Sequence, residues 1–307
     1  MLKGIFKDSH PAIQLLMMLV FIFSGALAGQ LLGMFVIFMK YGFSIEIVQA
    51  VMSNMVDYPV ALRELQFFSA LGTFIFPAIV LGYLFSDNYK DYLKIDAPIR
   101  ISPVVWVILS MIVVLPFLNF IAYYNQQIHF PEYLKPLEER LRLQEETAEN
   151  ITRSMLNMEN LWALILNTVV VGLFAAVGEE FIFRGILQNV FGKFLRNKHV
   201  IIWTVAIIFS LAHFQFFGFV PRVLLGAYFG YLVYFTNNIW IPVIAHFTHN
   251  FIIVMSFWVY KEQPEKLDDM DAIGTGPSWW MALISLIFFI AVFRIIQKQS
   301  QLQNLSS

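Results

Sequence analysis

The feature that most constrains this chain is a series of apolar segments long enough to cross a lipid bilayer. A helix needs about 20 residues to span about 30 Å of hydrocarbon, because each residue adds about 1.5 Å. Eight segments reach or approach this length: 12–39, 66–85, 103–124, 161–177, 200–220, 223–235, 239–260 and 279–293. They lack the period-two polarity of barrel strands. The sequence therefore predicts an all-α integral membrane protein, with about eight transmembrane helices in a single multi-pass domain over residues 1–307.

The composition supports this fold class. Of the 307 residues, 59% are hydrophobic and 13% are charged, whereas a water-soluble domain carries about a quarter charged residues. The formal net charge is −1, so no basic excess suggests nucleic acid as a partner. The chain has no cysteine, which excludes disulfides, thiolate metal ligands and a cysteine nucleophile. The expected partners are the lipid bilayer and a membrane-anchored protein or peptide.

The first apolar segment also resembles a signal peptide, because Lys3 and Lys7 precede it and Ala26-Leu27-Ala28 resembles a cleavage site. Its 28 residues, 12–39, exceed the apolar core of a signal peptide, which is about 7–15 residues. We therefore interpret it as a retained span. With eight spans both termini share one side, and that side carries ten Lys and Arg residues against five in the opposite short loops. This bias predicts a cell-membrane protein with cytoplasmic termini.

One extended polar segment, residues 125–158, interrupts the apolar series. Apolar residues recur in it at steps of three and four, at Leu134, Leu137, Leu141, Ala148, Ile151, Met155 and Met158. This pattern predicts an amphipathic helix that lies at the membrane interface. A lid over a substrate site is the less favoured interpretation.

Ionisable residues within the apolar segments indicate a functional site, because a charge in the hydrocarbon core is costly. The fourth segment ends in Gly-Glu-Glu-Phe-Ile-Phe-Arg-Gly (178–185), the fifth contains His213, and the seventh contains His246, His249 and Asn250. These residues lie on consecutive central segments. Residues 160–260 are therefore expected to form catalytic core helices around an intramembrane cavity.

Helical spacing assigns a different role to each residue of this set. Glu180 and Arg184 are four residues apart, so they share a helix face and can form an ion pair. Glu179 lies about 100° around the helix and remains a free carboxylate, suited to act as a general base. His246 and Asn250 are also four apart and could donate hydrogen bonds to an oxyanion.

A water held by His213 and Glu179 would complete a site for peptide-bond hydrolysis. Counted from the expected cytoplasmic ends, Glu179 and His246 each lie at a depth of roughly 12 Å, about eight residues at 1.5 Å each. These depths are compatible with a single site.

The ordered motifs Glu-Glu-x-x-x-Arg (179–184), Phe-x-x-x-His (209–213) and His-x-x-x-Asn (246–250) resemble those of the CPBP family. This family contains the type II CAAX prenyl endopeptidases and related, ABI-like bacteriocin-processing or immunity proteins. The resemblance covers about residues 160–260. It implies an intramembrane endopeptidase whose catalytic cavity opens toward the cytoplasm. In this site Glu179 activates water with help from His213, while His246 and Asn250 stabilise the oxyanion. A CAAX or prenylated protein is one substrate class that the family name suggests.

The resemblance leaves the cofactor open, at none or a single Zn²⁺. The family is usually named a metalloprotease, although a metal-free glutamate mechanism has also been argued for it. Glu179, His213 and His246 form a donor set of the catalytic His₂Glu type. They lie on three different helices and lack a His-Glu-x-x-His motif, which counts against zinc.

Two other functions are compatible with the same residues. Glu179, His213 and His246 could relay protons in a transporter, or the fold could serve a non-catalytic bacteriocin-immunity protein. Of the residues outside the motifs, His249 is expected to be packed or bonded across helices. Gly226 and Gly230 are expected to allow close helix packing.

Overall fold

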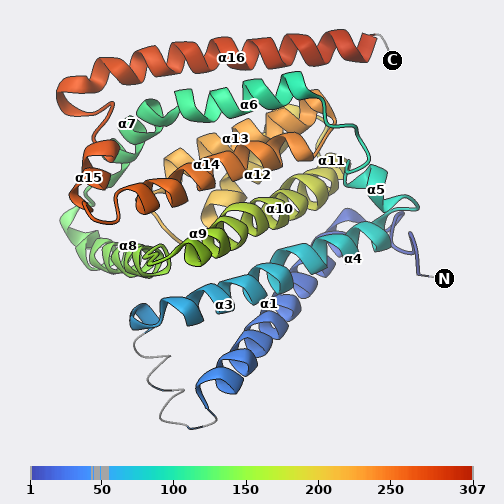
Figure 1. The fold of residues 1–307 in the computed structure, drawn as a ribbon. Helices are drawn as coiled ribbons and strands as arrows, with labels where there is room; N and C mark the ends of the chain where they lie inside the picture. Colours follow the sequence, from blue (N-terminus) through green and yellow to red (C-terminus); the bar gives the residue numbers. More distant parts are fainter. Residues whose placement is uncertain (1, 43, 45–48, 50–54, 306–307) are drawn as a thin grey trace.

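The computed structural model describes residues 2–42, 44, 49 and 55–305. Among these residues there are only helices, turns and irregular segments. Both termini emerge at one end of the bundle, and α8 (Lys135–Met155) and α15 (Glu265–Asp271) lie at the opposite end (Figure 1). The prediction of an all-α membrane fold is therefore confirmed.

Each of the eight predicted spans has a helical counterpart, and six of these are long and apolar enough to cross a membrane. Three are single helices, α1 (Pro11–Tyr41), α13 (Phe219–Thr236) and α14 (Trp240–Val259). The other three join several elements: α3–η2–α4 (Pro59–Phe85), α9–η4–α10–η5–α11 (Leu161–Phe194) and α15–α16 (Glu265–Leu302).

The two remaining predicted spans are less regular. The pair α6 (Ile101–Val113) and α7 (Leu115–Gln126) is bent by 43° and brings the number of spans to seven if it crosses as one. Helix α12 (Lys198–Leu211) is apolar but short. At about 1.5 Å per residue its 14 residues cover roughly 21 Å, less than the hydrocarbon core.

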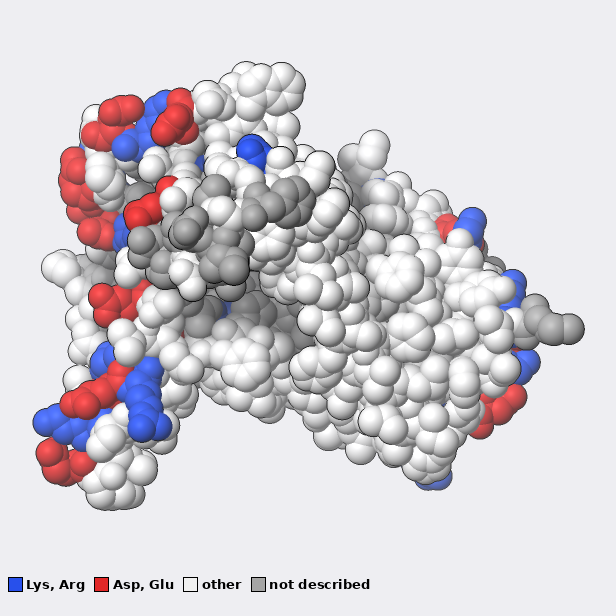
Figure 2. Space-filling model, turned by 90° about the horizontal axis from the view of Figure 1, so that it is seen from below, with Lys and Arg blue, Asp and Glu red and all other residues white. Residues whose placement is uncertain are grey.

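The charged side chains gather at the two ends of the molecule, and a broad uncharged surface separates them (Figure 2). Many large apolar side chains of the long apolar helices are exposed, such as Phe23 at 70% and Leu27 at 62% in α1 and Ile287 at 66% in α16 (Trp279–Leu305). A surface of this kind suits lipid as the surrounding solvent. The chain is a multi-pass membrane protein.

Close glycine contacts hold α1 against the second span. A methyl group at Gly25 would lie 2.0 Å from the carbonyl oxygen of Gly72, and one at Gly29 would lie 2.4 Å from that of Phe68. Small residues at this spacing let the two backbones approach, and close packing of this kind stabilises helix pairs in lipid.

We expect Gly25→Ala to lower the free energy of unfolding by about 1–3 kcal/mol, because backbone atoms oppose the added methyl group. Gly192→Ala, where nothing lies within 4 Å, should be neutral or slightly stabilising. Unfolding of the detergent-solubilised variants measures both. Equal stability of the two variants would contradict the close packing of α1.

Helix α8 is present within the segment predicted to contain an amphipathic helix. Part of it contacts the rest of the protein, and most of its side chains are exposed. The guanidinium of Arg142 lies 4.2 Å from the ring centroid of Phe217, and Glu145 accepts a hydrogen bond of 3.2 Å from the Phe217 backbone N–H. Near its end, Arg63 of α3 donates to the carbonyl oxygen of Met155. The helix therefore packs against residues 212–218, the turn that carries His213.

A buried hydrogen-bond network fixes the start of α8 and gives it a pH dependence. The Phe130 N–H, followed by the Arg142 guanidinium, lowers the pKa of Glu138 from 4.5 to about 2. A lowered pKa in the folded state means that the network stabilises the fold above pH 4.5 and is lost as the pH falls toward 2. Pepsin should therefore cut within residues 126–134 more slowly in wild type than in Glu138→Gln at pH 4.5, with the difference vanishing near pH 2. A constant difference would contradict this assignment.

Candidate active site

The central helix of the site, Leu161–Phe194, contains two π-helical segments that flank the adjacent glutamates. The segments are η4 (Thr168–Phe174) and η5 (Phe181–Leu187), and α10 (Ala175–Glu180) lies between them. Single π turns inside α-helices occur frequently at functional sites. The hydrophobic pattern of this segment did not predict them.

This helix also extends further than predicted. It continues to Phe194, so Glu179 lies 194 − 179 = 15 residues from its end, or roughly 22 Å at 1.5 Å per residue. The predicted depth of about 12 Å was counted from an end about eight residues after Glu179, and the helix continues beyond that end. The polar residue Asn189 is accommodated within the extension because its side chain donates to the carbonyl oxygens of Tyr92 and Gly185.

Glu180 is the centre of a buried polar cluster. Its Oε1 accepts a hydrogen bond of 2.9 Å from Nη1 of Arg184, and both side chains are fully buried. Nη2 of Arg184 donates to the carbonyl oxygen of Gly226 at 2.9 Å, and its guanidinium lies 4.5 Å from the ring centroid of Phe209. The ion pair expected from helical spacing is therefore present, and α13 and α12 surround it.

The same carboxylate oxygen also contacts His246 on α14, which was not predicted. His246 Nδ1 lies 3.0 Å from Glu180 Oε1. A carboxylate paired with arginine accepts hydrogen bonds, so Nδ1 carries the proton and, in the neutral ring, Nε2 is left as the acceptor. The imidazole is also stacked on Phe229, with the ring centroids 5.1 Å apart. Glu180 and Phe229 thus fix both the tautomer and the orientation of His246.

Glu179 faces the free side of this imidazole. Its Oε2 lies 3.8 Å from His246 Nε2, too far for a direct hydrogen bond. This oxygen is buried and has no hydrogen-bond partner among the described residues. Polar atoms at such a separation can be bridged by one water molecule. The structure therefore places an unpaired carboxylate beside an imidazole nitrogen that can accept a proton.

His213 lies just beyond the end of α12, on a turn, and not inside a continuous span over 200–220 as predicted. Its Nδ1 bonds to the carbonyl oxygen of Phe209 at 2.9 Å. A carbonyl only accepts, so Nε2 of the neutral ring is left without the proton. The Phe209 ring contacts both His213 and His246, with centroids 5.0 and 6.1 Å away. Phe209 therefore lines the space between the two histidines.

Asn250 bonds to the central helix. Its Nδ2 donates a hydrogen bond of 3.0 Å to the carbonyl oxygen of Val171 in η4. His246 and Asn250 thus attach α14 to the central helix at two points, Glu180 and Val171. This hydrogen bond uses one of the two amide hydrogens of Asn250, and the other amide hydrogen remains available to a ligand.

Glu179, His213 and His246, which the sequence left open as possible zinc ligands, do not form a metal site in this arrangement. Among the described residues, no three His, Asp or Glu side chains lie close enough together to hold a metal ion. A catalytic zinc of the His₂Glu type needs three such ligands around one point. The residues present therefore do not fit a resident zinc.

The glycines Gly226 and Gly230 pack as expected. A methyl group at Gly226 would lie 3.1 Å from the Phe209 ring, and one at Gly230 would lie 2.8 Å from Ile202. Both contacts join α13 to α12. They also bring the Gly226 carbonyl within reach of Arg184, a contact that a side chain at this position would obstruct.

Comparisons with known proteins agree with the motifs. Residues 161–252 match the family model described as type II CAAX prenyl endopeptidase Rce1-like. The uncharacterized protein YpbD of Bacillus subtilis (strain 168) is 25% identical over 179 residues, which cover 56% of this chain and 78% of that protein. No solved structure matches the chain. The resemblance drawn from the three motifs is confirmed over residues 161–252, which are similar to the type II CAAX prenyl endopeptidases.

Proposed function

We propose that this protein is an intramembrane endopeptidase that hydrolyses a peptide bond of a membrane-associated protein or peptide. The observation that carries the proposal is the buried, unpaired Oε2 of Glu179, 3.8 Å from His246 Nε2. A carboxylate without a cationic partner is costly in a membrane. It is well suited to accept a proton from water.

In the proposed reaction, a water molecule lies between Glu179 and His246 and donates a hydrogen bond to each. Glu179 takes one proton as the water oxygen attacks the substrate carbonyl carbon. The carbon–nitrogen bond then breaks, and the leaving amine receives that proton from Glu179. The products are a new carboxyl terminus and a new amino terminus.

The remaining residues are proposed to support this step. Glu180, which is paired with Arg184, orients the imidazole of His246. The buried carboxylate of a Ser-His-Asp triad orients its catalytic histidine in the same way. Asn250 has one amide hydrogen available for the developing oxyanion. The sequence assigned His246 to the oxyanion as well, but its proton lies on Nδ1, so we place His246 with the water. His213 is proposed to assist through Nε2.

The substrate is proposed to be membrane-anchored, because the site lies within apolar helices. A CAAX or prenylated protein fits the family match and is the first class to examine. Residues 160–260 are proposed as the catalytic core of a single domain. The cell membrane, with cytoplasmic termini and a cytoplasmic opening of the site, is proposed as its location.

Mass spectrometry of peptide termini tests the function and finds the substrate. Membranes that contain the protein are compared with membranes that lack it. New carboxyl termini that appear only with the protein support proteolysis, and their sequences show whether a CAAX motif was cut. Identical sets of termini, with the protein folded and abundant, would contradict the proposed function in those membranes.

A further inference from the structure

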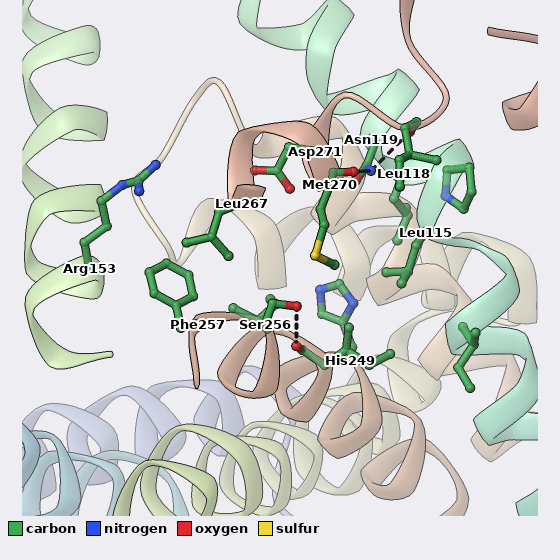
Figure 3. A pocket seen from close by; sticks show the side chains of 15 residues that line it. Leu115, Leu118, Asn119, Arg153, His249, Ser256, Phe257, Leu267, Met270 and Asp271 are labelled. Carbon is green, nitrogen blue, oxygen red and sulfur yellow. Dashed lines mark hydrogen bonds between the residues drawn. The ribbon is translucent and has the colours of Figure 1, made fainter. Parts of the chain in front are cut away.

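A cavity of about 420 Å³ lies beside α14, on the side of the bent pair α6–α7 (Figure 3). The 43° bend between these helices and α15 border it, and it is partly open to the surface. Most of its wall is aliphatic or aromatic, from Ile112, Leu115, Leu118, Ile252, Phe257 and Leu267. The cavity is therefore mainly an apolar space.

Most polar side chains of the wall are already bonded within the protein. Asn119 donates to the carbonyl oxygens of Met270 and Ile273, and Ser256 donates to that of Ile252. At the rim, Arg153 is paired with Glu149 at 2.8 Å, and Asp271 contributes the opposite charge. Because Arg153 is already paired with Glu149, the carboxylate of Asp271 leaves the rim with an excess of negative charge.

His249 is the exception. Its Nδ1 is buried and has no hydrogen-bond partner among the described residues. Of the two expected arrangements, this nitrogen is packed and not bonded across helices. Figure 3 shows its imidazole standing among the lining side chains, below Met270. Buried polar atoms are nearly always partnered in proteins, and an exception calls for a group that the protein does not itself supply.

Water alone is a poor occupant of this space. A water molecule takes about 30 Å³ and needs two to four polar partners. The cavity is more than ten times larger and its wall is mostly apolar. Its volume lies instead in the range of about 300–1,000 Å³ that is typical of sites for small organic ligands.

We propose that this cavity binds a single-chain amphiphile with an uncharged hydroxyl head group. The hydroxyl exchanges a hydrogen bond with His249, and the alkyl chain packs against α7, α14 and α15. The mainly apolar wall disfavours a charged head group, and the acidic rim further disfavours an anionic one. The single unpaired nitrogen fits one small polar group. His249 lies one turn after His246 on α14, so the ligand packs against the helix that carries the candidate active site. This ligand site is independent of the proposed hydrolysis.

A photoreactive analogue of dodecanol, with a diazirine on its chain, tests the site in nanodiscs of saturated phosphatidylcholine. Labelled peptides are identified by mass spectrometry. We expect saturable labelling within 252–257 and 267–273, competed by dodecanol and much less by dodecane. His249→Phe should weaken binding about 3–10-fold, as expected for one lost hydrogen bond, and Met270→Trp should abolish it by filling the cavity.

Two variants outside the cavity serve as matched controls. His199→Phe removes a histidine that bonds to Tyr231 at the other end of the bundle. Ile287→Trp adds an indole at an exposed apolar position. Both should label as wild type does. Unfolding temperatures check that each variant is folded, and Ile252→Trp replaces Met270→Trp if that variant is not.

Three results would overturn the proposal. Labelling that rises linearly with probe concentration would indicate bulk lipid contact only. Equal labelling of wild type and a folded cavity-filling variant would show that the probe binds elsewhere. Equal competition by dodecane and dodecanol, with unchanged affinity in His249→Phe, would show that the hydroxyl is not recognised.

Discussion

Glu179→Gln is expected to lower the rate of cleavage by about 10²–10⁴-fold, the usual contribution of a general base. Glutamine has nearly the same shape as glutamate but cannot take a proton from water. Glu179 lies outside the Glu180–Arg184 pair, so its replacement leaves no cation without a partner. Stability should therefore be retained or slightly increased, because a buried unpaired carboxylate is removed.

The measurement is the initial rate on the substrate peptide identified from its termini, with the protein in vesicles. Glu146→Gln, on the exposed side of α8, is the matched control and should cleave at the wild-type rate. A folded Glu179→Gln protein that cleaves within a few-fold of wild type would exclude Glu179 as the base. If both activity and stability were lost together, the residue would have a structural role instead.

The second large effect is expected on stability. Arg184→Met should lower the free energy of unfolding by about 3–5 kcal/mol, because it leaves the Glu180 carboxylate buried without its cation. The carbonyl oxygen of Gly226 loses its donor as well. Unfolding of the purified protein in mixed detergent micelles, followed by circular dichroism, gives this value.

Two further variants make this result specific. Arg153→Met removes an exposed ion pair with Glu149, at 43% and 56% side-chain exposure, and should cost about 0–1 kcal/mol. Adding Glu180→Gln to Arg184→Met should recover part of the loss, since the buried charge is then gone. Equal costs for Arg184→Met and Arg153→Met would contradict the burial of the pair.

Contacts within one helix could be predicted from the sequence. The Glu180–Arg184 pair follows from a spacing of four residues, and the separate position of Glu179 follows from one residue of helical rotation. The apolar segments likewise predicted the helices of the bundle. These features depend on the spacing of residues along a single helix, and this spacing can be read from the sequence.

Contacts between helices could not be predicted in the same way. The bond from Glu180 to His246 depends on the relative rotation and height of two helices, which the spacing within either one does not determine. The π segments η4 and η5 add to the difficulty, because they change the register of the central helix. The bond from Asn250 to Val171 depends on η4 in the same way.

The ends of helices were also misjudged where polar residues are satisfied by the backbone. The fourth predicted segment, with its polar motif, ended at Gly185, yet Asn189 bonds to two carbonyl oxygens and the helix continues to Phe194. The fifth span ends early, at Leu211, without a nearby proline or glycine. Instead, Phe214 adopts a positive φ of 54°, an uncommon conformation for a bulky residue, and the chain turns there.

The central claim is that Glu179 directs water onto a peptide bond, and oxygen-18 labelling tests it most directly. Vesicles with wild type or Glu179→Gln, at matched abundance, are incubated with substrate in H₂¹⁸O and analysed by mass spectrometry without further digestion. We expect one ¹⁸O atom in the new carboxyl terminus with wild type and a product at least about 100-fold less abundant with the variant. Equal ¹⁸O-labelled product from both proteins would contradict the claim, as would a wild-type product whose new terminus contains no ¹⁸O.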